Sequence, residues 1–201
     1  MTTHASGGDD RRELIARSAI TVIARDGARA LTHRAVDREA GIPEGATSHH
    51  ARSRQALIGL IIESLESRTL ADLQVFVDSL RASETSDVDA FAQRLAALVD
   101  ALAFRREDMR ARYVLMLEPA GDPSVQAELA VSSEIDALAM RAVAQALAGA
   151  GLDHSAEQVH QLMALADALV FSRTVTGTRI DVTTVLAAHL RGSPRHPHPS
   201  E

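Results

Sequence analysis

The fold is decided by one stretch of sequence, Thr32–His50, which reads THRAVDREAGIPEGATSHH. Thr32 has the side chain to cap a short helix over His33–Ala40, which ends where Gly41 supplies a left-handed turn. A second short helix is predicted over Pro43–His50, because proline suits the first helical position. Two short helices joined by a glycine turn predict a helix-turn-helix.

Helices are also predicted on both sides of this stretch. Before it, apolar residues recur on one face of a helix over Arg11–Asp26, and Gly27 follows where a C-terminal cap belongs. After it, Ser53 has the side chain to cap a long helix that continues to Leu80. Three short helices therefore precede a long one.

The rest of the chain repeats the helical pattern. An apolar 3-4-3-4 stripe marks one helix, Asp122-Pro123 and Ser155 are helix starts, and Asp181 opens the last helix. The predicted helices cover residues 88–102, 106–117, 123–149, 156–175 and 182–190. The sequence thus predicts an all-α protein of about nine helices.

The predicted organisation has two unequal domains between short tails. Residues 1–10 are polar and expected to be flexible, and 192–201 contain three prolines and are expected to be disordered. Between them, 11–52 form the helix-turn-helix domain and 53–191 a larger helical domain. No linker is long enough to separate the two.

Charge is distributed unevenly along the chain. The net charge is -6, but residues 1–55 carry a local +2 and the remainder a local -8. A basic N-terminal part is compatible with nucleic acid binding in spite of the acidic total. There is no cysteine, so disulfides and thiolate metal sites are excluded.

The sequence gives no indication of catalysis or of a membrane span. We find no catalytic triad, metal-ligand cluster or phosphate loop, so an enzyme, a cofactor and a metal site are not expected. The N-terminus is polar and no apolar run approaches the ~18 residues that a span needs. A cytoplasmic protein is therefore expected.

The helix-turn-helix resembles that of the TetR family of bacterial repressors over about residues 11–65. The matching residues are Thr32, Ala35-Val36, Ala40-Gly41-Ile42, Gly45 and Ser53-Arg54-Gln55-Ala56-Leu57. The chain departs from the family where Thr47-Ser48-His49-His50-Ala51 replace an aromatic-rich stretch. The resemblance implies a homodimeric repressor that a small effector releases from a palindromic double-stranded operator.

Positions of DNA contacts follow from the motif. Phosphate contacts are expected from Thr32, His33, Arg34, Ser53 and Arg54, which lie at helix starts. Base edges are expected to face Gly45, Ala46, Thr47, Ser48 and His49, and His50 can donate to a base edge or a phosphate. The alternative for the Ser-His-His run, a metal or catalytic site, requires adjacent residues that point about 100° apart to converge.

The last two helices carry apolar residues on more than one face, so one face needs a partner. The resemblance implies a dimer interface made by these two helices of each subunit. The residues assigned to it are Val159, Leu162, Ala166, Leu169, Val170, Val182, Val185, Leu186 and Leu190.

A ligand pocket is expected between the middle helices, for a mainly hydrophobic effector. Its predicted lining comprises Phe104, Arg110, Tyr113, Met116, His160, Met163, Asp167 and Phe171. The stripe from His160 to Phe171 is equally consistent with core packing or a dimer contact. An alternative function follows from that: a DNA-binding dimer controlled by a protein partner, or one without a ligand.

Overall fold

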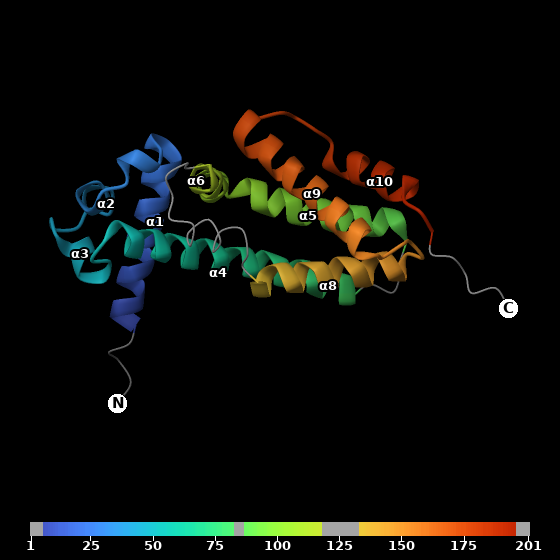
Figure 1. The fold of residues 1–201 in the computed structure, drawn as a ribbon, viewed down its shortest axis with the longest axis horizontal. Coiled ribbons are helices and arrows are strands. Elements are labelled where there is room, and N and C mark those ends of the chain that lie inside the picture. Colours follow the sequence, from blue (N-terminus) through green and yellow to red (C-terminus); the bar gives the residue numbers. More distant parts are fainter. Residues whose placement is uncertain (1–5, 83–86, 118–132, 196–201) are drawn as a thin grey trace. The chain divides into compact units, whose positions relative to one another are not determined.

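The computed structural model describes residues 6–82, 87–117 and 133–195, and helices account for most of them (Figure 1). In these residues the only extended pairing is an isolated bridge between Leu152 and Arg195. The all-α prediction is confirmed. No helix in the described part of the chain is long and apolar enough to cross a membrane.

The chain divides into two compact units, with one boundary inside the long helix α4 (Arg54–Arg81). Unit 1 extends to Arg68 and resumes at Arg106, and unit 2 holds the rest. Unit 1 contains α1 (Ser6–Asp26), the 3₁₀ turn η1 (Ala28–Ala30), α2 (His33–Glu39), α3 (Ala46–His50), the first part of α4 and α6 (Arg106–Met116).

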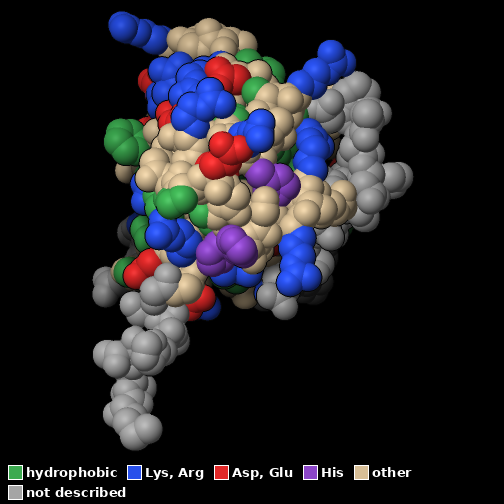
Figure 2. All heavy atoms as spheres, turned by 90° about the vertical axis from the view of Figure 1, so that its left-hand side faces the viewer, with side chains coloured by type: hydrophobic (Ala, Val, Ile, Leu, Met, Phe, Trp, Pro, Cys, Tyr) green, Lys and Arg blue, Asp and Glu red, His purple; other side chains and the backbone are tan. Residues whose placement is uncertain are grey.

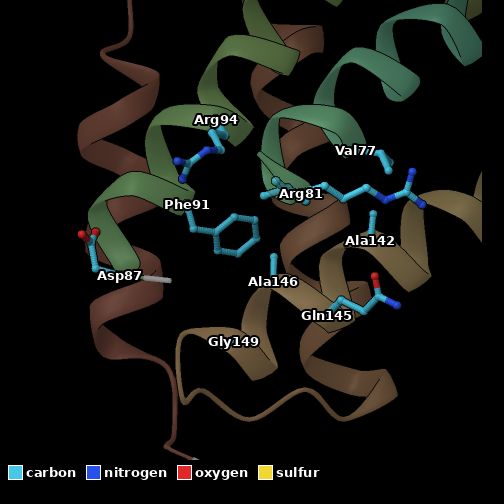
Figure 3. A pocket seen from close by; sticks show the side chains of 10 residues that line it. Val77, Arg81, Asp87, Phe91, Arg94, Ala142, Gln145, Ala146 and Gly149 are labelled. Atoms are coloured by element: carbon cyan, nitrogen blue, oxygen red, sulfur yellow. The ribbon is translucent and has the colours of Figure 1, made fainter. Parts of the chain in front are cut away.

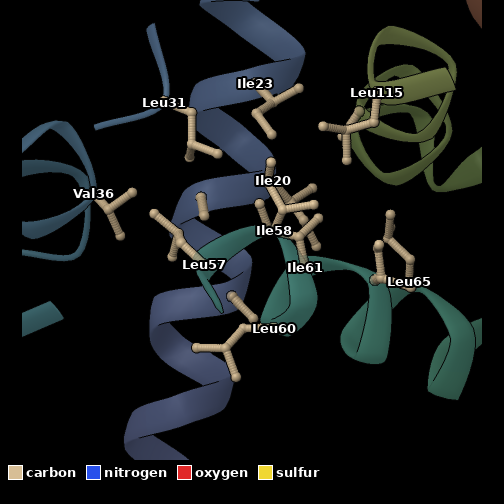
Figure 4. Packing of buried hydrophobic residues seen from close by; sticks show 14 of the residues in the cluster. Ile20, Ile23, Leu31, Val36, Leu57, Ile58, Leu60, Ile61, Leu65 and Leu115 are labelled. Carbon is tan, nitrogen blue, oxygen red and sulfur yellow. The ribbon is translucent and has the colours of Figure 1, made fainter. Parts of the chain in front are cut away.

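Unit 1 is held by one apolar cluster drawn from all its longer helices (Figure 4). The inward faces of α1 and α4 supply most of it, and α6 adds Ala111 and Leu115. Its largest members include Ile15, Ile20, Ile23, Val36, Leu57 and Ile61, none more than 1% exposed. Residues 106–116 therefore belong to the same compact unit as the N-terminal helices.

Unit 2 contains the end of α4 with α5 (Val88–Phe104), α8 (Ser133–Gly149), α9 (Ala156–Phe171), the π-helical turn η2 (Ser172–Thr176) and α10 (Val182–Gly192). Helix α5 is central, because α9 and α10 both pack along it, and α8 packs on α9 (Figure 1).

Helix starts were predicted best where a side chain caps the helix. Thr32, Ser155 and Asp181 each accept the expected capping hydrogen bond from a backbone N–H, and Asp87 caps α5 in the same way although the sequence analysis did not name it. The start of the first helix differs: α1 begins at Ser6, so residues 6–10 are helical rather than flexible. The start expected at Asp122-Pro123 lies outside the described residues.

The residues assigned to a dimer interface are mostly core residues of unit 2, so that assignment is corrected. Seven of the nine are buried within the single chain, because the faces they occupy pack against α5 and its neighbours. The buried ones are Val159, Leu162, Leu169, Val170, Val182, Leu186 and Leu190. Only Ala166 and Val185 keep partial exposure.

Candidate nucleic-acid interface

The turn between α2 and α3 has the geometry that the sequence predicts. Gly41 has a positive φ of 63°, and the two bonds of a Schellman motif close the helix end. The Gly41 N–H donates to the Arg38 carbonyl (3.3 Å) and the Ile42 N–H to the Asp37 carbonyl (3.0 Å). Helix α3 begins at Ala46 instead of Pro43, because Gly45 has φ 91° and cannot be helical.

Helix α2 holds the N-terminus of α3 through Asp37. The residue is only 2% exposed, and its two carboxylate oxygens accept the N–H groups of Gly45 (2.7 Å) and Thr47 (2.8 Å). Gly45 has no side chain to cap the helix, so the cap comes from α2. Burial alone would raise the pKa of Asp37, but the Thr47 side chain and these two N–H groups outweigh it and lower the pKa.

The same helix holds the C-terminus of α3 through His33. The Nε2–H of His33 donates to the carbonyl oxygen of Ala51 (2.7 Å), the C-cap residue of α3. His33 and Asp37 are four residues apart, so they lie on one face of α2. An anion at the start of a helix and a donor at its end both suit the helix dipole.

The contacts of Asp37 and His33 with the two ends of α3, here called the clamp, determine which face of α3 lies at the surface. Thr47 is fully buried on the inner face and therefore cannot reach a base edge, contrary to the expectation. Ser48 and His49 are exposed, and Gly45, Ala46 and His50 are partly exposed. The outward polar groups of this short helix are therefore those of Ser48 and His49, with His50 beside them.

Some residues expected to contact phosphates already have partners within the protein. Arg54 donates to the Ala28 carbonyl (3.0 Å), which ties the start of α4 to η1, and His33 is in the clamp. Arg34 pairs with Glu44 (2.6 Å) at the surface. Ser53 caps α4 by accepting the Ala56 N–H (3.1 Å).

The sequence reasoning missed three exposed arginines of unit 1: Arg29, Arg38 and Arg52. None of their side chains makes a hydrogen bond or ion pair with another residue that the structure describes. Figure 2 shows the side of the molecule that carries α2 and α3, where basic side chains and histidines lie together on the surface. The signal available in the sequence was an arginine directly beside the motif, as Arg52 is.

The predicted ligand pocket is not assembled within either unit. Arg110, Tyr113 and Met116 lie on α6 of unit 1, where Tyr113 is part of the buried interior. Phe104 in unit 2 is 88% exposed, and His160, Asp167 and Phe171 are also exposed, with Met163 half-buried. The cavity that the structure describes in unit 2 is lined by other residues, both apolar and charged, from α4, α5 and α8. The described residues include no group of three or more histidine or carboxylate side chains that could hold a metal ion.

Comparison with known proteins agrees with this architecture. A family model described as the Tetracyclin repressor-like C-terminal domain matches residues 86–193. No curated protein matches the chain.

Among solved structures, a transcriptional regulator from Rhodococcus sp. RHA1 is 18% identical with a TM-score of 0.70, covering 92% of this chain and 99% of that one. A Saccharomonospora viridis protein in complex with choline is 19% identical, TM-score 0.67, covering 91% and 94%. The multidrug binding protein EbrR complexed with imidazole is 22% identical, TM-score 0.62, covering 96% and 93%. At these identities the likeness shows the fold alone.

Proposed function

Because the chain belongs to the TetR family of transcriptional regulators, we propose that it is a cytoplasmic, dimeric repressor that binds a palindromic DNA operator. Each subunit reads one half-site with α3, and a small-molecule effector releases the complex. The observation that carries the proposal is how α3 is attached and which of its side chains are exposed. It is held at both ends by α2 and turns the polar side chains of Ser48 and His49 outward.

The outward residues divide into two kinds of DNA contact. Ser48 and His49 have donors and acceptors for base edges in the major groove, and Gly45 and Ala46 permit close approach. His50 lies at the end of the helix, where it can reach a base or a phosphate. Thr47 is not included in the set because it is buried.

Phosphate contacts come from the residues around α3. The starts of α2 and α4 offer the exposed Thr32 and Ser53, and Arg52 stands between α3 and α4 without a partner among the described residues. Arg34 can contribute once Glu44 releases it. Phosphate contacts orient the protein and carry no sequence information themselves.

A second copy of the chain would pack on the outer face of α9. Ala164, Ala168 and Phe171 recur at i, i+4 and i+7, which places them on one face of α9, and all three are exposed, as is Val175 in the η2 turn that follows. Small side chains allow helices to approach closely, and two large apolar residues at one end would lose exposed area in a dimer.

Two similar structures were solved with small molecules, imidazole and choline, which supports an effector for this chain too. Release requires that the effector bind the DNA-free arrangement of the dimer better than the DNA-bound one.

The proposal is tested by fluorescence anisotropy with DNA that flanks the chain's own gene, at two salt concentrations. We expect saturable, palindrome-dependent binding by two subunits. Ser48→Ala and His49→Ala should change the preference among operator variants by about tenfold. Arg52→Gln should weaken binding to every DNA sequence and reduce the dependence of log affinity on log salt concentration by about 1. Arg141→Gln, which removes an exposed charge from α8, is the matched control.

Two results would contradict parts of the proposal. Binding that is weak and independent of sequence would remove the repressor assignment. A dimer that binds its operator but no small molecule would favour control by a protein partner. For the dimer surface, Ala168→Glu should give monomers in sedimentation analysis, and Ala148→Glu on the exposed face of α8 should not.

A further inference from the structure

A cavity of about 150 Å³ lies in unit 2 among three helices (Figure 3). The end of α4, the start of α5 and the second half of α8 each turn one face toward it. The wall from α8 consists of Ala142, Ala146 and Gly149, at i, i+4 and i+7, together with Gln145. The space exists because the residues that α8 places there are small.

The size of the cavity limits its guest to about a single ring. A 150 Å³ apolar cavity in another protein accommodates benzene, whereas pockets for drug-sized ligands begin at about 300 Å³. The apolar part of the lining here is Val77, Leu80 and Phe91, with the two alanines of α8. In Figure 3 the Phe91 ring projects into the space between the helices, where a flat guest could lie against it.

The charged side chains that the structure describes in the lining are those of Arg81, Arg94 and Asp87. Arg94 already interacts with another group, so Arg81 is the lining arginine that a guest carboxylate can engage. Asp87 caps α5 by accepting the Ala90 N–H (2.7 Å), and in Figure 3 its carboxylate points away from Phe91. Its charge is therefore directed to the helix terminus rather than to a guest.

Arg81 is the side chain best placed to bind that anion. Its side chain is 72% exposed, and its ion pair with Asp78 is long, 3.6 Å, so turning toward a guest costs little. Gln145 lies on the same side of Phe91 as Arg81 in Figure 3, with Ala142 between them. A guanidinium and an amide N–H₂ can both donate to one carboxylate.

We propose that this cavity binds a small carboxylic acid whose apolar body, about the size of one ring, lies against Phe91 and whose carboxylate is held by Arg81 and Gln145. Binding itself does not depend on DNA. The inference rests on the proposed function only where the acid is taken to be the effector that releases the operator.

The test is a saturation-transfer NMR titration of the full chain with benzoate, and with benzylamine as a ring of the same size and opposite charge. Benzoate should bind with a Kd of about 0.1–1 mM, as expected for so small a ligand, and benzylamine at least tenfold more weakly. Arg81→Gln should weaken benzoate binding about tenfold. Arg141→Gln, on α8 but outside the cavity lining, should leave it unchanged.

A second variant tests the cavity without removing charge. Ala146→Leu places a larger apolar side chain in the space and should abolish benzoate binding while the far-UV circular dichroism stays unchanged. The inference is overturned if benzoate shows no saturable binding, if benzylamine binds as well, or if either Arg81→Gln or Ala146→Leu binds benzoate like the wild type.

A parallel operator-release assay separates this inference from the proposed function. If benzoate binds in the cavity but leaves the operator complex intact, the site stands and the acid is not the effector. If a different compound releases the operator while benzoate does not bind, the site is refuted and the effector-released repressor stands.

Discussion

Replacing Asp37 should loosen α3 and lower both stability and operator affinity. In Asp37→Asn one oxygen can still accept the Thr47 N–H, but the new N–H₂ group faces the Gly45 N–H, donor against donor. Each hydrogen bond to a charged acceptor contributes roughly 1.5–3 kcal/mol. One lost bond and one weakened bond therefore predict a loss of about 2–4 kcal/mol in the free energy of unfolding.

The loss can be measured in unit 1 alone. The chain has no tryptophan and a single tyrosine, Tyr113, which is buried in α6 of unit 1, so tyrosine fluorescence follows that unit. With a urea m value of about 1–3 kcal/mol/M, the midpoint of the Tyr113 transition should fall by about 1–2 M. Glu39→Gln is the control, because Glu39 is on the same helix and makes only a surface ion pair with Arg25.

The reasoning fails if Asp37→Asn unfolds at the same urea concentration as the wild type and the Glu39→Gln control. A drop in operator affinity measured where the Tyr113 signal is still native would separate positioning of α3 from loss of fold. If Asp37→Asn is destabilised but binds the operator normally, then Asp37 stabilises unit 1 without orienting α3.

Two further predictions concern charged groups. Arg68 on α4 bridges Glu13 of α1 (2.6 Å) and the buried Asp108 of α6 (3.0 Å). Arg68→Met should therefore lower the free energy of unfolding by about 2 kcal/mol, after allowance for partial exposure, and with it the urea midpoint of the Tyr113 signal. An unchanged midpoint would show that apolar packing alone holds α6 on α1. Hydrogen bonds from Thr184 lower the pKa of Asp181, so its stabilisation of α10 is complete above the ordinary aspartate pKa of about 4 and is lost as pH falls through the lower folded value. Thermal midpoints between pH 5 and 2 should therefore drop less for Asp181→Asn than for the wild type, and equal slopes would contradict the assignment.

The sequence predicts what is local. Thr32, Ser155 and Asp181 cap their helices as expected, because capping depends only on residues three positions apart. Gly41 is left-handed for the same local reason. The inward direction of Thr47 was not predictable, because a five-residue helix is too short to show a period and a polar residue suggests exposure.

Contacts between helices that are distant in the sequence could not be predicted, for a different reason. An apolar stripe shows that a face is buried but not by what, so Leu162 and Leu186 were assigned to a second subunit although α5 covers them in the same chain. The face of α9 that we propose for the dimer is rich in alanine and carries little hydrophobic signal. The cavity escaped prediction because it depends on how Phe91 meets Ala142 and Ala146, which no single helix reveals.

The unusual composition of α3 and the clamp from α2 are connected. A helix of five residues has no stability of its own, so something must hold it in place. Its buried side chain, Thr47, is small and polar and offers little apolar contact. Asp37 at one end and His33 at the other supply the attachment by hydrogen bonds. Because directional bonds fix an orientation more narrowly than apolar contact does, the angle at which Ser48 meets DNA should depend on α2, and changes in α2 that never touch DNA should alter operator preference.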